Sequence, residues 1–399
     1  MSDKARSVLL IVLCQVSAMT LWFSASSASS SLLAAGEISG QQAGLLTGAV
    51  QLGFVAGTLF SAWFGLPDRL DPRRLFAVCA LVAAMANLSL LVTGFGTTTT
   101  IILRFITGAM LAGVYPVGMK LAAGWADRSV GLMIGTLVGA LTLGSALPHL
   151  FGALSGLEWR TTINISSLCG VLAGLAILLV KLGPAHRTSP RFIPGQAWQE
   201  LKRPALLLAN AGYLGHMWEL YAMWAWIGVF LTWGLAQAGA AQSLQPGMLT
   251  FVVIASGAIG CVAAGYLADR VGRTTVTMTA MIISGICAAT IGLLPPAGPV
   301  VLLVVAIIWG ITIIADSAQF SAAIAELSPP GLVGSMLTLQ TSAGFLLTFF
   351  AIQAMPVLIE YLTWRFAFAA LAIGPFLGTI AMWKLRHQPE AVRLAGGRL

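Results

Sequence analysis

Long runs of apolar residues make up most of the chain, and short polar segments separate them. A helix needs about 20 mostly apolar residues to cross a bilayer. The apolar residues are continuous and do not alternate with polar ones, so the pattern predicts membrane-spanning helices and argues against a β-barrel. The twelve predicted spans are 7–34, 41–64, 75–94, 99–123, 129–153, 161–183, 204–234, 245–267, 275–295, 298–325, 331–356 and 366–386.

The first run has a second interpretation, as a cleaved signal peptide. Lys4 and Arg6 precede it, and small residues at 26–31 resemble a cleavage site. The run is long, however, and its removal would leave eleven spans and break the repeat described below. We therefore interpret it as the first membrane helix.

Basic residues indicate how the spans are oriented. If the N-terminus is cytoplasmic, all but three of the 21 Lys and Arg residues fall on the cytoplasmic side, and the exceptions are Arg104, Arg160 and Arg365. The positive-inside rule describes this asymmetry. It predicts a multi-pass protein of the cell (inner) membrane with both termini in the cytoplasm.

The longest polar stretch, 184–203, divides the spans into two groups of six. It contains several prolines and basic residues and reads as a cytoplasmic linker. The predicted units are an N-terminal six-helix bundle at 1–183, this linker, a C-terminal six-helix bundle at 204–386, and a cytoplasmic tail at 387–399.

Composition supports a membrane protein and excludes several other classes. Hydrophobic residues make up 58% of the chain and charged residues 9%, against about 25% charged in soluble domains. The five cysteines lie in apolar runs with no Cys/His cluster, so we expect no disulfide framework, metal or cofactor. Membrane topology accounts for the net charge of +8, so no nucleic-acid partner is expected.

The two groups of spans carry repeated sequence signals in the same order. The recurring pairs are LPDRLDPRR at Leu66–Arg74 with LADRVGRTT at Leu267–Thr275, Gly131 with Gly334, and Trp159-Arg160 with Trp364-Arg365. The spacings are 201, 203 and 205 residues. Three signals at nearly one spacing indicate duplicated halves.

The segment GYLADRVGR at Gly265–Arg273 resembles the loop motif of the major facilitator superfamily, and the N-terminal copy departs from it at Phe64, Asp71 and Pro72. RFITGAMLAG at Arg104–Gly113 resembles the fourth-helix motif of that family. The resemblance implies an all-α membrane protein of twelve helices in two pseudo-symmetric six-helix bundles. It also implies a gating role for the loop residues, and a topogenic charged loop is the alternative. These residues are Asp68, Arg69, Arg73, Gly265, Asp269, Arg270, Gly272 and Arg273.

Charges inside membrane spans are costly and therefore point to function. Away from the span ends, Arg104, Glu219 and Asp316 are such residues. The resemblance implies that helices 1, 4, 7 and 10 line a central cavity, and these three residues fall on helices 4, 7 and 10. We predict Glu219 as the proton-coupling carboxylate. His216, three residues earlier on the same helical face, is a candidate to share its proton. A permanently neutral, hydrogen-bonded Glu219 is the alternative.

The other two charges have open interpretations. Asp316 either binds a cation or a substrate amine, or caps a break in its helix. Arg104 either binds an anionic substrate or pairs with backbone carbonyls.

Aromatic residues gather near Glu219. Trp218, Tyr221 and Trp224 are spaced three apart, and Trp22 lies on the first helix. They are candidates for an aromatic wall around a substrate, and core packing is the alternative.

These observations together predict a secondary transporter of a small organic solute, coupled to protons and working by alternating access as a monomer in the lipid bilayer. An uncoupled facilitator and a non-transporting assembly or sensor protein are the alternatives. No nucleophile or metal constellation suggests an enzyme.

The predicted orientation can be tested by labelling introduced cysteines. In a cysteine-free background, we expect Gln199→Cys in the linker to react with a membrane-impermeant maleimide only after the cell membrane is opened. Glu37→Cys, in the first predicted outer loop, should react in intact cells. Labelling of Gln199→Cys in intact cells would contradict the orientation.

Overall fold

The computed structural model describes residues 2–125, 130–156, 158–184, 192–240 and 243–398, with the backbone alone at 130–132. Residues 185–191 of the predicted linker, with Arg128, Arg187 and Arg191 of the charge pattern, lie outside this description, as does the side-chain environment of Gly131. The described residues form α-helices and short 3-10 helices with no strand. The predicted fold class, an all-α membrane protein, is confirmed.

Every predicted run contains at least one helix. The helices of the first half are α1 (Asp3–Phe23), α2 (Ser29–Ala34), α3 (Gly40–Phe64), α4 (Leu66–Arg69), α5 (Pro72–Leu88), α6 (Leu90–Thr93), α7 (Thr98–Leu111), α8 (Tyr115–Ala123), α9 (Val130–Leu154) and α10 (Trp159–Ala176). After the linker helix α11 (Pro194–Glu200), the second half contains α12 (Pro204–Gln237), α13 (Pro246–Val271), α14 (Arg273–Thr290), α15 (Pro299–Thr312), α16 (Ser317–Leu327), α17 (Val333–Ala367) and α18 (Ile373–Arg386). A 3-10 helix, η6 (Pro389–Gly396), follows α18.

By length and composition, 10 of the described helical segments qualify as membrane spans. The last of them, Val333–Arg386, is 54 residues long and contains both α17 and α18. Thr363 interrupts it with a non-helical backbone. Helix α12 is not among the ten, although its 34 residues would extend about 50 Å. It carries several polar groups, and these lower its hydropathy.

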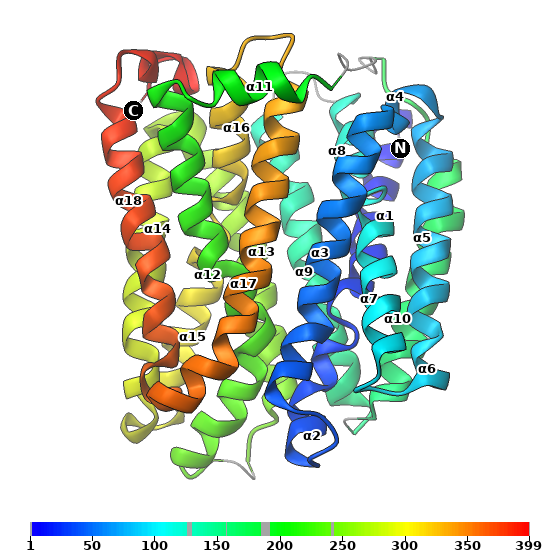
Figure 1. Cartoon of the computed structure of the whole chain (residues 1–399), viewed down its shortest axis with the longest axis vertical. Coiled ribbons are helices and arrows are strands. Elements are labelled where there is room, and N and C mark those ends of the chain that lie inside the picture. Colours follow the sequence, from blue (N-terminus) through cyan, green and yellow to red (C-terminus); the bar gives the residue numbers. More distant parts are fainter. Residues whose placement is uncertain (1, 126–129, 157, 185–191, 241–242, 399) are drawn as a thin grey trace.

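The two halves lie side by side, with α1 to α10 on one side and α12 to α18 on the other (Figure 1). Both chain ends and α11 lie at the same end of the molecule (Figure 1). Contacts between the halves are made chiefly by α9 with α13 and by α3 with α17. These four helices therefore form most of the boundary between the halves.

Local sequence explains where several helices begin and end. Ser39 forms a capping box with Gln42 at the start of α3, which satisfies two free backbone donors. Gly65 ends α3 in the left-handed conformation, with φ 60°. Proline in the first turn starts α5, α12, α13 and α15, where a missing backbone donor has no cost.

Three spans are broken near their middle. The first is interrupted after Phe23, the fourth between α7 and α8 at 112–114, and the tenth between α15 and α16 at 313–316. The fourth and tenth spans occupy equivalent positions in the repeat. Breaks of this kind leave helix ends and free backbone groups inside a membrane protein, where they are tolerated only against protein or a polar site.

Helices α3 and α7 pack through glycines. A Cβ atom on Gly53 would lie 1.9 Å from the Phe105 carbonyl oxygen, and one on Gly108 would lie 2.0 Å from the Val50 carbonyl oxygen. Such close approach of two backbones is typical of small residues at membrane helix contacts.

Gly108→Ala tests this contact. Because the added methyl group meets backbone atoms that cannot rotate away, we expect a loss of about 1–3 kcal/mol in the free energy of unfolding, measured in detergent by chemical denaturation. Gly334→Ala is the matched control, because a Cβ atom there meets nothing within 4 Å. Equal stability of the two variants would contradict the packing described.

Candidate functional site

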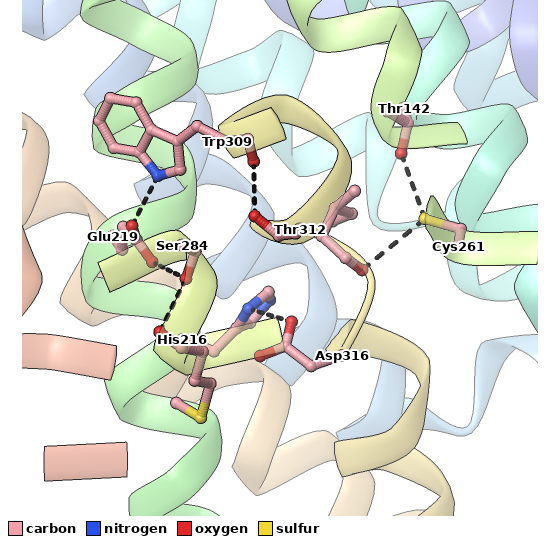
Figure 2. Close-up of polar contacts among 10 residues, drawn as sticks. Thr142, His216, Glu219, Cys261, Ser284, Trp309, Thr312 and Asp316 are labelled. Carbon is pink, nitrogen blue, oxygen red and sulfur yellow. Dashed lines mark hydrogen bonds and ion pairs between the residues drawn. The ribbon is translucent and has the colours of Figure 1, made fainter. Parts of the chain in front are cut away.

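Glu219 lies on α12 and is 1% exposed. Its Oε1 accepts a hydrogen bond of 2.7 Å from Trp309 Nε1 on α15, and its Oε2 accepts one of 3.0 Å from Ser284 Oγ on α14 (Figure 2). None of the ion pairs among the described residues includes Glu219. The carboxyl group is thus held between three helices of the C-terminal half by neutral donors.

His216 pairs with Asp316 rather than with Glu219 (Figure 2). Its Nδ1 lies 2.9 Å from Asp316 Oδ1, and both side chains are almost fully buried. The two atoms are close enough to interact, although Asp316 Oδ1 has no hydrogen bond of good geometry among the described residues.

We predicted that His216 and Glu219 share a proton, but the structure shows no direct contact between their side chains. Side chains three residues apart on a helix point about 60° apart. That divergence sends Glu219 toward Trp309 and Ser284 and His216 toward the break between α15 and α16. Asp316 immediately precedes α16, at this break.

Arg104 is fully buried and makes all its described contacts inside the N-terminal half. Its Nε donates to the Leu46 carbonyl at 3.0 Å, and Nη1 donates to the Leu21 carbonyl at 3.0 Å. Nη2 donates to the Trp22 carbonyl. The guanidinium therefore satisfies backbone oxygens at the end of α1, next to the break in the first span. These contacts match the backbone-carbonyl interpretation of Arg104.

Asn87 extends this network and was missed by sequence reasoning. It is fully buried on α5, and its Oδ1 accepts from Arg104 Nη1 at 3.2 Å and from Ser24 Oγ at 2.6 Å. Its Nδ2 donates to Ser167 Oγ at 3.0 Å. A single neutral amide in an apolar run carries little signal, and only the neighbouring Arg104 reveals its role.

Three of the four predicted wall aromatics meet at the boundary between the halves. Trp22 stacks with Tyr221 at a ring-centroid distance of 5.8 Å, and Tyr221 contacts Trp224 edge-on at 5.4 Å. Phe54 of α3 and Phe345 of α17 close the cluster, with centroids 4.5 Å apart. This cluster joins α1 and α3 to α12 and α17.

Trp218 does not join them. It is half-buried, and its indole Nε1 donates to the Ala370 carbonyl at 3.3 Å. A Cβ atom on Gly374 of α18 would touch its ring. Trp218 therefore packs inside the C-terminal half, whereas Tyr221 contacts Trp22 of the other half.

Several buried polar groups have no described hydrogen-bond partner. Among them are both amide atoms of Gln15, Gln51 and Gln340, and the indole nitrogens of Trp22 and Trp224. Buried polar atoms are satisfied in the great majority of structures by protein, water or a ligand. Gln51 and Gln340 were not predicted from the sequence, because glutamines inside apolar runs have no motif around them.

The N-terminal loop motif binds within its own half. Asp68 forms an ion pair with Lys120 of α8, and Lys120 also donates to the Pro67 carbonyl at 2.8 Å. Arg73 donates to both carboxylate oxygens of Asp71, and these bonds hold the pKa of that carboxyl below its usual value. Arg69 is exposed.

In the C-terminal copy, Arg273 makes the ion pair with the broken span. Arg273 makes a bidentate pair with Glu326 of α16, at 2.8 and 2.7 Å, and donates to Gln319 at 2.7 Å. Gly272 adopts φ 98°, which glycine tolerates best.

The remaining residues of this copy lie around the loop. Asp269 lies 3.7 Å from Arg273, Arg270 stacks over Tyr266, and Gly265 lies beside Gly135 of α9. In each half, the loop is thus tied to the second helix of a broken span, α8 or α16.

The described residues contain no group of three metal-ligating side chains. The structure thus has two similar halves. Each half has a charged loop that contacts a broken span. The sequence matches the family profile of the Major Facilitator Superfamily over residues 11–352 and 220–399. The chain belongs to the Major Facilitator Superfamily. It is therefore a multi-pass membrane transporter, as predicted.

Solved structures of Major Facilitator Superfamily members share the fold at low identity. The nucleoside transporter NupG (D323A mutant) is 15% identical, with a TM-score of 0.73 over 95% of this chain and 99% of that one. The proton:xylose symporter XylE bound to 6-bromo-6-deoxy-D-glucose is 14% identical, with a TM-score of 0.68 over 96% of each chain. The human organic anion transporter MFSD10 (TETRAN) is 15% identical, with a TM-score of 0.67 over 96% and 100%. No curated protein sequence matches significantly.

Arg104→Lys tests the anchoring of the first span. A lysine has three donors and lacks the planar fork, so we expect it to lose bonds to the α1 and α3 carbonyls. Hydrogen bonds to charged groups are worth about 1.5–3 kcal/mol each, so the free energy of unfolding should fall by at least about 2 kcal/mol. Arg160→Lys, at an exposed position, is the control. Unchanged stability of Arg104→Lys would show that the network does not hold α1.

Proposed function

We propose that the protein is a proton-coupled secondary transporter of a small organic solute. It acts as a monomer in the cell (inner) membrane, with both termini and the 184–203 linker in the cytoplasm. The halves at 1–183 and 204–386 rock against each other, so that a site between them opens alternately to either side. Membership of a transporter family supports the general mechanism, and the buried carboxyl groups support the coupling.

The environment of Glu219 carries the coupling proposal. The carboxyl is buried and contacts no cation, although buried charges are normally paired. Ser284 Oγ lies 3.0 Å from Glu219 Oε2 and also 3.2 Å from the Met281 carbonyl oxygen. One hydroxyl proton serves only one of these acceptors at a time.

This arrangement satisfies both protonation states of Glu219. In the ionised state, the carboxylate accepts from Trp309 and Ser284. In the neutral state, Oε2 carries the proton and donates to Ser284 Oγ, whose own proton turns to the Met281 carbonyl. A site that hydrogen-bonds both forms can take up and release a proton without leaving a buried group unsatisfied.

The location of Glu219 links proton binding to movement. Its partner Trp309 lies on α15, four residues before the break at 313–316 that contains Asp316. A shift of α15 or α14 relative to α12 would break a bond to the carboxyl. Proton affinity at Glu219 therefore depends on the arrangement of these helices, which is what coupling requires.

Glu219→Gln separates coupling from transport. Glutamine resembles the neutral acid in shape and in hydrogen bonding, so the variant should keep solute exchange in proteoliposomes but lose accumulation driven by a pH gradient. Radiolabelled uridine and xylose are the first solutes to use. Glu360→Gln, at an exposed position on α17, is the control and should accumulate solute like the wild type. Full gradient-driven accumulation by Glu219→Gln would contradict the assigned role.

A further inference from the structure

Each fixed charge within the spans has its partners in its own half of the molecule. Arg104 is surrounded by carbonyl and amide oxygens of the N-terminal half, and Asp316 pairs with His216. Glu219 is held by Trp309 and Ser284. A charged solute moved out of water into the protein requires a partner of opposite charge. Binding one here would require breaking one of these arrangements.

Four side chains with unpartnered buried polar atoms, on helices at or next to the boundary, are neutral amides and indoles. Trp22 and Trp224 are fully buried, and their indole N–H groups have no acceptor. Gln51 is fully buried on α3, and neither its Oε1 nor its Nε2 has a partner. Gln15, equally buried and unpartnered, precedes Trp22 by two helical turns and so lies on the same side of α1.

Gln51 and the two indoles lie at the aromatic cluster that joins the halves, and Gln15 lies two helical turns away along α1, beside Gly118 of α8. Gln51 is one turn from Phe54, whose ring lies 5.0 Å from the Trp22 ring. Trp22 stacks on Tyr221, and Tyr221 contacts Trp224. Amide and indole groups without hydrogen-bond partners therefore lie beside the aromatic faces of this cluster.

We propose that the transported solute is uncharged and bears several hydroxyl, carbonyl or amide groups, which Gln15, Gln51 and the indoles of Trp22 and Trp224 recognise. This inference rests on the proposed transport function. Amides supply a donor and an acceptor each, and indoles supply donors. The aromatic rings cover an apolar or planar face of the solute.

The similar folds do not decide the substrate class. One neighbour is a nucleoside transporter, one a xylose symporter and one an organic anion transporter. The distribution of charge in this chain distinguishes them, because an organic anion would find no free cation among the described residues at the boundary.

The test is direct binding to the purified full-length protein. The neutral probes are nucleosides, pentoses, hexoses and polyols, and the charged probes are benzoate and tetraethylammonium. We expect a neutral probe to raise the melting temperature saturably and the charged probes to have no effect. Binding of a charged probe alone, or of no neutral probe, would overturn the inference.

Removing the amides sharpens the test. Gln51→Leu and Gln15→Leu should each weaken binding of the neutral probe by about tenfold or more, because one or two hydrogen bonds are lost. The same variants should keep or raise the melting temperature of the ligand-free protein, since an unsatisfied buried amide is replaced by an apolar group. Gln199→Leu, at an exposed position on α11, is the control. Unchanged affinity in both boundary variants contradicts the assignment.

Flux separates this inference from the proposed transport function. If a neutral probe binds but does not cross proteoliposome membranes, recognition stands and the transport proposal fails. If benzoate or tetraethylammonium crosses and no neutral probe does, transport stands and the neutral-solute inference fails.

Discussion

Every polar group inside a membrane span must find its partner within the protein, because lipid offers none. Arg104 meets this requirement with the carbonyl oxygens that become free where the first helix breaks after Phe23. The break and the charge thus satisfy each other, and this contact fixes the backbone that carries Trp22. The boundary between the halves is built around that position, with Phe54, Tyr221 and Phe345 packed on the Trp22 ring.

The C-terminal half satisfies its buried polar groups with different partners. Its tenth span also breaks, but the polar groups there are acids, and they are held by His216, Trp309 and Ser284. The Ser284 hydroxyl lies within reach of both Glu219 and the Met281 carbonyl and can change its partner, whereas the Arg104 guanidinium donates to fixed backbone carbonyls. The two halves thus share a duplicated architecture but hold their buried charges in different ways. In the proposed mechanism, the N-terminal half holds the first span in place and the C-terminal half binds the proton at Glu219.

The fold was largely predictable from sequence, because length and apolar content suffice to identify a membrane helix and duplication left Asp68 and Asp269 at matching positions. Among the site residues, the charged ones were the most readily predicted from the sequence. Arg104, Glu219 and Asp316 stand out in apolar runs, but their partners do not. The partner of His216 depends on where the break at 313–316 falls, and the place of Trp218 depends on the rotation of α12. Asn87, Gln51 and Gln340 carry no charge and belong to no motif, so only the assembled structure reveals them.

The proposals that an uncharged solute binds between the halves and that a proton binds at Glu219 can be tested together. Each transport cycle must move net positive charge. Electrical recording from proteoliposomes adsorbed to a supported membrane measures this directly when uridine or xylose is added without a pH gradient. The account predicts a solute-dependent current carrying positive charge in the direction of proton movement. Solute flux that is electrically silent would contradict it.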